Sequence, residues 1–168
     1  MHCIGRWFAR LGLFGVALLA GCDKPTPTSS SADEEKAIKD TFAAFQAALE
    51  ARDADKLWAL LGSDSQADAE SAAKTLRESF VKANAEQKAE QEQALGLPAA
   101  ELAKLTGAGF LKTKRFHGKY HEVPGSKIAK VTAQGDKVKV EYIEEDGDRE
   151  TLNLVRQDGK WKLSLKMP

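Results

Sequence analysis

Two groups of residues in this chain have the types and spacing that metal chemistry could use. His117 and His121 are four apart in FHGKYH, a spacing that can clamp a metal when both lie on one helix. The surrounding pattern indicates loop or strand, which places them about 13 Å apart, so no metal site is expected there. The run EEDGDRE, residues 144–150, concentrates the oxygen ligands that calcium prefers, but it lacks the spaced acids and final glutamate of an EF-hand loop. Because Asp146-Gly147 suits a hairpin, we expect a solvated turn.

Enzymatic chemistry has little support in the sequence. No serine lies in a nucleophile-elbow motif, and no thiol is paired with a base. Tyr142 is expected on the apolar face of its strand, either as a core aromatic with its hydroxyl at the rim or as a group that points into a pocket. Trp58 and Trp161 are the other candidates for lining such a pocket. We therefore expect no catalytic residue, no cofactor and no metal.

The two cysteines, Cys3 and Cys22, both lie near the N-terminus. Arg6 and Arg10 accompany a short apolar run, Leu11 to Ala20, which is the pattern of a secretory signal. The run has about ten residues, fewer than the ~20 that a membrane-spanning helix needs. Residues 1–21 are therefore interpreted as a signal peptide and not as a membrane span.

The residues Leu19-Ala20-Gly21-Cys22 resemble the lipobox of bacterial lipoproteins. The resemblance implies cleavage after Gly21, loss of Cys3 and lipid attachment to the Cys22 thiol. Lipoproteins of this pattern carry a diacylglycerol and usually a third chain, palmitate for example, and two or more chains anchor a protein stably. The alternative is an ordinary signal peptide that contains a cysteine.

Residues 22–31 are expected to form a tether between the lipid and the folded part. The run DKPTPTSSS has no apolar periodicity and reaches only about 30 Å at ~3.6 Å per residue. The domain should therefore stay near the membrane of the cell envelope, facing the periplasm or the exterior. Asp23 resembles the inner-membrane retention signal of some Gram-negative groups.

A basic cluster surrounds Phe116 and consists of Lys112, Lys114, Arg115 and Lys119. Contact with anionic lipid headgroups or an acidic polysaccharide would be worth about 1 kcal/mol per basic residue. The alternative is a solvated strand edge protected by charge. Removal of residues 1–21 takes two of the 25 basic residues and leaves 23 against 25 acidic ones, so no net positive charge attracts nucleic acid.

The apolar period divides the rest of the chain near Lys112. Helical spacing before that point and strand alternation after it predict one α+β domain over residues 32–168, with helices packed on an antiparallel sheet. We expect a first helix with the apolar stripe Ile38, Phe42, Phe45 and Leu49, a second around residues 57–61, a long one over 66–95 and a short one over 98–106 that Gly107 and Gly109 stop. Four strands follow, with a fifth if residues 116–123 form one.

This layout resembles the nuclear transport factor two-like superfamily, which includes polyketide-cyclase-like and ketosteroid-isomerase-like proteins. The matching stretches are residues 38–61, IKDTFAAFQAALEARDADKLWALL, and residues 131–165, which end in DGKWKLSL. The resemblance implies a cystatin-like cone, in which helices cover a curved sheet and leave a pocket. Residues 63–115 are longer and more helical than in that family, and such an insertion could fill or cover the pocket.

Three functions follow as expectations. The first is a lipid-anchored, non-catalytic domain that binds an envelope protein or a small apolar ligand. The second is an isomerase-like or cyclase-like enzyme that uses an internal pocket with Tyr142 or an unplaced carboxylate. The third is a structural or stress-related envelope protein.

Overall fold

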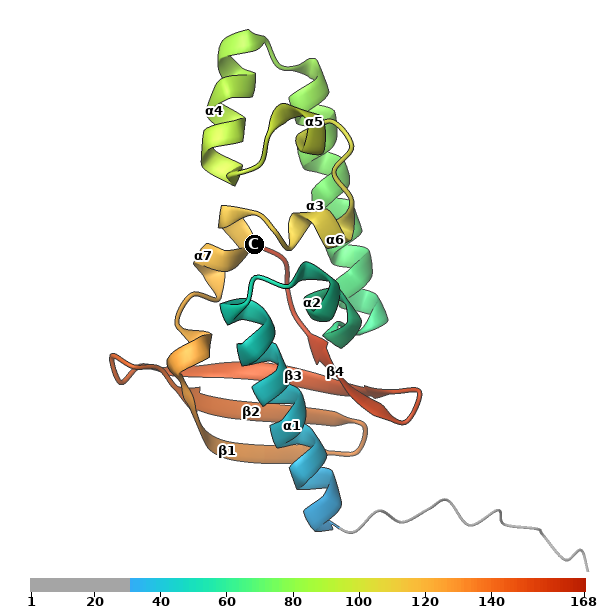
Figure 1. Cartoon of the computed structure of the whole chain (residues 1–168). Helices are drawn as coiled ribbons and strands as arrows, with labels where there is room; N and C mark the ends of the chain where they lie inside the picture. The colour runs from blue at the N-terminus through green and yellow to red at the C-terminus, as the bar shows by residue number, and fades with distance from the viewer. Residues whose placement is uncertain (1–30) are drawn as a thin grey trace, which may run out of the picture.

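The computed structural model describes residues 31–168 (Figure 1). The predicted signal peptide, Cys22 and tether lie outside the described residues, apart from Ser31. The helices are α1 Ser31–Glu50, α2 Ala54–Leu60, α3 Ser63–Lys82, α4 Ala85–Leu95, α5 Ala99–Leu102, α6 Gly107–Phe110, α7 Lys114–Lys119 and the 3₁₀ turn η1 Val123–Gly125. The strands are β1 Lys127–Gln134, β2 Lys137–Ile143, β3 Arg149–Gln157 and β4 Lys160–Ser164.

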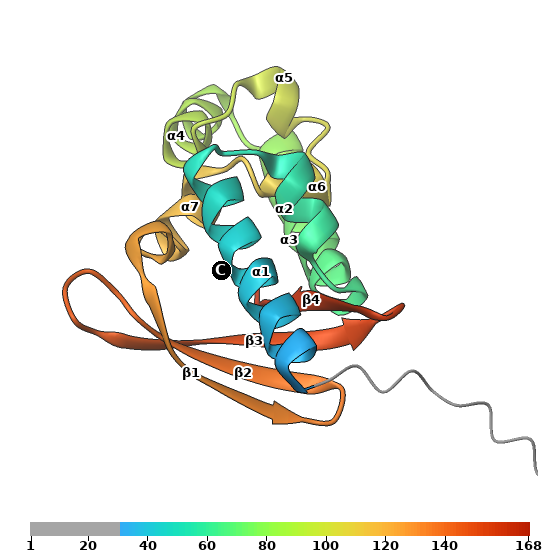
Figure 2. The same ribbon diagram turned by 60° about the horizontal axis from the view of Figure 1, so that its bottom comes forward.

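The four strands form one antiparallel sheet in the order β1-β2-β3-β4. Helix α1 lies across one face of it (Figures 1 and 2). The α+β class and the antiparallel sheet are therefore confirmed. The prediction of a fifth strand at residues 116–123 is wrong, because α7 and η1 occupy this segment.

The apolar stripe of α1 fastens the helix to the sheet. Ile38, Phe42, Phe45 and Leu49 are all buried, as their helical spacing predicted. The Phe42 ring lies 5.5 Å from the Tyr142 ring on β2. Burial of each such side chain stabilises the fold by about 1.5–3 kcal/mol, so α1 is held at several points along its length.

Helices α3, α4 and α5 form an arm that projects away from the sheet (Figure 1). The sequence predicted one helix over residues 66–95, but the chain turns at Ala83-Asn84 and forms two. The Asn84 side chain accepts a hydrogen bond from Gln87 N, and the Gln87 side chain accepts one from Asn84 N. This capping box satisfies two backbone donors and starts α4 as a separate helix.

The glycines of this region also differ from their predicted roles. Gly62 precedes α3 as its N-cap. Gly107 begins α6, whose N-cap Thr106 accepts a hydrogen bond from Gly109 N, so neither glycine stops a helix. A Cβ at Gly107 would lie 2.9 Å from Glu70 N. Gly107 therefore permits close packing of α6 on α3.

One apolar cluster joins the arm, α1 and the sheet. It extends from Ile38 on α1 through Phe80 on α3 and Leu102 on α5 to Leu163 on β4. Within the described residues, no helix is both long and apolar enough to span a membrane. The described helices and strands thus share one apolar core.

Candidate functional site

A cavity of about 430 Å³ opens at the end of the sheet where β2 and β3 join. Its walls come from the Lys119–Glu122 segment, from Tyr142 and Glu144, from β3 residues 150–153, and from Ser164 to Lys166. We call it the acidic cavity, because it collects Glu122, Glu144 and Glu150. These segments lie up to 47 positions apart in the sequence.

The cavity exists because β4 is shorter than β3. Strand β4 pairs with β3 only from Asn153 to Gln157, whereas β2 pairs with β3 from Arg149 onward. After Ser164 the chain leaves the sheet: Leu165 N donates to Ser65 Oγ at 2.8 Å, and the Tyr120 hydroxyl donates to Lys166 O at 3.2 Å. The first residues of β3 therefore border the cavity instead of a fourth strand.

Tyr142 contributes a hydroxyl to the wall of the acidic cavity. The residue is 5% exposed and lines the cavity, and its hydroxyl makes no hydrogen bond with any described residue. Burial raises the pKa of Tyr142, and the charges of Glu144, Glu150 and Glu122 raise it further. The hydroxyl oxygen is not fully buried but reaches the open space of the cavity. This hydroxyl is therefore available to a ligand.

Three carboxylates meet beside the cavity. Glu122, Glu144 and Asp146 each offer one oxygen, and these oxygens lie within 4.8 Å of one another. Partial burial, a hydrogen bond to Glu122, and the charges of Glu122, Glu150 and Asp146 raise the pKa of Glu144 to about 7. Among the described residues no lysine or arginine forms an ion pair with Glu144. Glu144 therefore keeps its proton up to near neutral pH.

The β2–β3 hairpin positions these acids. Asp146 Oδ1 accepts a hydrogen bond from Asp148 N at 3.0 Å, and Gly147 adopts φ +95°, as the predicted turn requires. A Cβ at Gly125 on η1 would collide with the side chain of Glu145. The hairpin can thus approach η1 closely, which brings Glu144 and Asp146 to Glu122.

The arrangement supports two kinds of chemistry. Oxygens around one Ca²⁺ lie 2.3–2.6 Å from the ion, hence at most about 5 Å from each other, and the three carboxylate oxygens meet this limit. A carboxyl with a pKa near 7 can also exchange a proton efficiently at neutral pH. The Tyr142 hydroxyl is a potential hydrogen-bond donor, whereas the Tyr120 hydroxyl, whose pKa burial raises to about 12, already donates to Lys166 O.

Of the three predicted pocket residues, the structure places one in the acidic cavity. Tyr142 lines it, whereas Trp58 and Trp161 do not. Trp58 is half-buried against the core. Trp161 is 8% exposed, and the Arg156 guanidinium stacks 4.9 Å from its ring centre.

The predicted basic cluster lies on and beside α7 instead of a strand. Phe116 at its centre is fully buried, while Lys112, Arg115 and Lys119 are exposed. Lys114 Nζ donates to Gln93 O at 3.2 Å, near the end of α4. This lysine therefore joins α7 to the arm, and only Lys119 lies at the acidic cavity.

His117 lies on helix α7, whereas His121 lies in the turn that follows the helix, so the expected loop or strand is wrong only for His117. His117 lies on α7 and is half-buried, and burial together with the charge of Arg52 lowers its pKa. His121 follows the helix, and its Nε2 lies 3.2 Å from Glu122 Oε1. The histidines thus have different neighbours, and His121 belongs to the acidic cavity.

Sequence analysis considered residues 144–150 as calcium ligands and favoured a solvated turn, so it did not select Glu144 or Glu150 as site residues, and it did not consider Glu122. One signal was present: Glu150 lies opposite Tyr142 in the β2–β3 register and alternates with Leu152, so it continues the inward face of the sheet. The approach of Glu122 to the hairpin joins residues more than twenty positions apart and has no local signature.

No protein family model, no curated protein and no solved structure matches this chain.

Proposed function

We propose that this chain is a lipid-anchored envelope protein whose domain binds a divalent cation, Ca²⁺ for preference, in the acidic cavity. Glu122, Glu144 and Asp146 supply the charged ligands, and the Tyr142 hydroxyl supplies a neutral oxygen. The observation that carries the proposal is the convergence of three carboxylate oxygens within 4.8 Å, beside a cavity that is also lined by Tyr142, whose hydroxyl has no hydrogen-bond partner among the described residues.

The electrostatics support a cation over a neutral or apolar ligand. Glu144 retains its proton to about pH 7 because like charges crowd it. A bound divalent cation would replace that proton and remove the repulsion between the acids. The cavity wall also includes polar residues such as Thr151 and Asn153, so a small apolar ligand suits it less well than a hydrated ion.

The anchor and the fold family remain parts of this proposal. The lipobox resemblance supports attachment at Cys22, and a tether of about 30 Å would keep the domain at the membrane surface. A helix lying across an antiparallel sheet, with a cavity at the sheet's end, supports the cone-shaped superfamily.

The test uses fragment 31–168, which holds the shared core, and terbium as a luminescent substitute for calcium. We expect saturable Tb³⁺ luminescence, sensitised by the nearby tyrosines and displaced by Ca²⁺, with dissociation constants of order 10⁻⁴–10⁻³ M, as in extracellular modules. Glu122→Gln with Glu144→Gln should abolish binding. Glu86→Gln with Glu90→Gln, which removes the same charge from the exposed α4, should leave it unchanged.

Tyr142→Phe tests the contribution of the hydroxyl separately from that of the carboxylates. It removes one neutral ligand and keeps the ring, so we expect calcium affinity to fall while the carboxylate sites remain. Absence of saturable binding in the wild-type fragment, or equal loss in the α4 control, would contradict the proposal.

A second candidate is an isomerase-like enzyme, and one observation favours it. Glu144, with its pKa near 7, lies by two tyrosine hydroxyls in a cavity. The carboxylate would take a proton from a carbon next to a carbonyl, a tyrosine hydroxyl would donate a hydrogen bond to the resulting oxyanion, and the carboxyl would return the proton. NMR of small ketones in D₂O tests this: deuterium uptake should require Glu144, and no uptake would exclude these substrates.

A further inference from the structure

The face of the sheet that points away from α1 has an uneven charge. Strand alternation and the pairing register place seven basic side chains on it, against the single acid Glu141. The basic residues are Lys127, Lys130, Lys137, Lys139, Arg149, Lys160 and Lys162. The whole chain carries 25 basic and 25 acidic residues, so this face concentrates positive charge in an otherwise balanced protein.

Neutral side chains separate these lysines along the strands, and a hollow of about 670 Å³ lies between the strands and the start of α3, whose Asp64 also lines it. One row across the four strands consists of Thr132, Lys139, Asn153 and Ser164, all of which line the hollow. In the next row Lys137 lies opposite Val155, which pairs with Lys162. The lysines therefore stand around the hollow and do not lie directly opposite one another.

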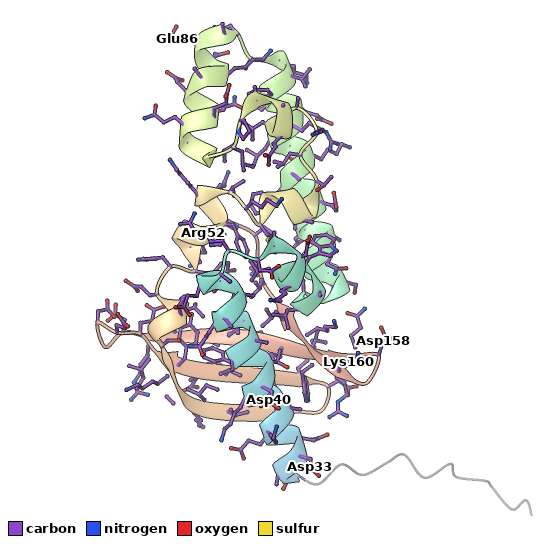
Figure 3. The ribbon with its side chains drawn as sticks, viewed as in Figure 1. Asp33, Asp40, Arg52, Glu86, Asp158 and Lys160 are labelled. Carbon is purple, nitrogen blue, oxygen red and sulfur yellow. The ribbon has the colours of Figure 1, made fainter. Side chains whose placement is uncertain are left out.

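The start of α1 lies at the same sheet. The side chain of Arg156 on β3 forms an ion pair with Glu34 in the first turn of α1, and its Nε lies 4.0 Å from Asp136 in the β1–β2 turn. Figure 3 places Asp33 at the sheet end of the molecule and Glu86 at the far end of the arm. A chain tethered through the residues before Ser31 would thus have its sheet, and not its arm, next to the anchor.

We propose that this basic sheet face docks on the anionic lipid headgroups of the membrane that holds the anchor, with the hollow around Lys137 and Lys139 receiving a headgroup phosphate. The proposal goes beyond cation binding and does not depend on the acidic cavity. Each basic residue near an anionic surface adds about 1 kcal/mol, or roughly fivefold in binding. Helix α4 carries Glu86, Glu90 and Glu92 but only one basic residue, Lys88. An anionic membrane surface would therefore repel this end of the arm.

The test is sedimentation of fragment 31–168 with phosphatidylcholine vesicles, with and without phosphatidylglycerol. We expect binding that needs phosphatidylglycerol and weakens with salt. Lys137→Gln, Lys139→Gln and Lys160→Gln together should reduce it by roughly a hundredfold, at about fivefold per residue. All three are exposed, so the fold should persist.

The matched control removes three charges elsewhere: Lys112→Gln, Arg115→Gln and Lys119→Gln at α7. This variant should bind vesicles as the wild type does. An equal loss in both triple variants, a loss in the α7 variant only, no vesicle binding by the wild type, or binding to soluble polygalacturonate in preference to vesicles would each overturn the assignment. Because Glu144 is untouched, calcium binding by the sheet variant separates this result from the cavity proposal.

Discussion

At the scale of single residues, Glu144 is the carboxyl whose ionisation the fold moves to near neutral pH. Its carboxyl lies among Glu122, Glu150 and Asp146, and burial with these neighbours raises its pKa from 4.5 to about 7. The cluster is costly without a cation, because a charged Glu144 repels its neighbours. That cost is the physical reason to expect that the protein's stability, and not only its ligand binding, responds to pH.

The direction in which stability changes with pH follows from the number of protons that the folded and unfolded states bind. The folded protein holds the Glu144 proton up to about pH 7, whereas the unfolded chain releases it near pH 4.5. Stability therefore falls as pH rises through this window. Glu144→Gln should remove this fall in stability and make the fragment more stable than the wild type above pH 7. The gain should be about 1 kcal/mol, a figure that is reduced for solvent screening.

Urea unfolding at pH values on both sides of the window measures this effect, with a chelator present. The difference should vanish below about pH 4.5, where the carboxyl is protonated in both states. Added calcium should reverse the order, because the cation stabilises only the wild-type site. Glu86→Gln on the arm is the control and should show neither effect. A wild-type advantage at high pH under chelation would contradict the assignment.

At the scale of the elements, the packing of α6 on α3 depends on a missing side chain. A Cβ at Gly107 would lie 2.9 Å from Glu70 N, and a backbone atom of a twenty-residue helix cannot easily retreat. Gly107→Ala should therefore destabilise the domain by about 1–3 kcal/mol. Gly118→Ala on α7, where no atom lies within 4 Å of the added Cβ, should be neutral or stabilise by roughly 0.5–1 kcal/mol.

Urea unfolding of both glycine variants decides the matter. If Gly118→Ala lowered stability as much as Gly107→Ala, the cause would be backbone conformation and not close packing. Calcium binding by Gly107→Ala should remain intact, since the α3–α6 contact is built from other elements than the acidic cavity.

The elements that the sequence predicted correctly are those with a regular period. The stripe of α1 and the alternation of β2 to β4 mark buried faces, and the buried residues lie where that pattern put them. The α7 segment has its own helical signal, because Phe116, Tyr120 and Val123 recur at i, i+4 and i+7 and all are buried. Its brevity and the glycine within it conceal that signal.

The ends of helices and the contacts between elements distant in the sequence were harder to predict. Asn84 and Gln87 have capping-box spacing that could have divided the predicted long helix, but the strong helix formers around them suggested continuity. The acidic cavity depends on the early end of β4 and on the approach of η1 to a hairpin. Both are set by tertiary packing, so only the inward position of Tyr142 could be anticipated.

At the scale of the whole molecule, the proposals define an orientation. In this orientation the sheet would lie at the membrane; α3 starts beside the sheet, where Ser63 N donates to Gln157 Oε1 at 3.0 Å. Helix α3 has 20 residues and so carries the arm roughly 30 Å from that point, at about 1.5 Å per residue. The tip of the arm should be the part of the domain farthest from the bilayer.

Labels on the lipidated protein test this orientation. Single cysteines introduced as Lys160→Cys in the sheet and Glu86→Cys in the arm would each be the only free thiol, if Cys3 is removed and Cys22 is acylated. Energy transfer to a dye in the bilayer should be several-fold stronger from position 160, because transfer falls steeply over distances like the length of α3. Equal transfer, or stronger transfer from position 86, would contradict a sheet-down arrangement.

Cys22→Ser should release the chain from membranes at high salt, because only the screened contacts of the sheet then remain. Retention of this variant at high salt would show that membrane attachment does not come from a lipid on Cys22.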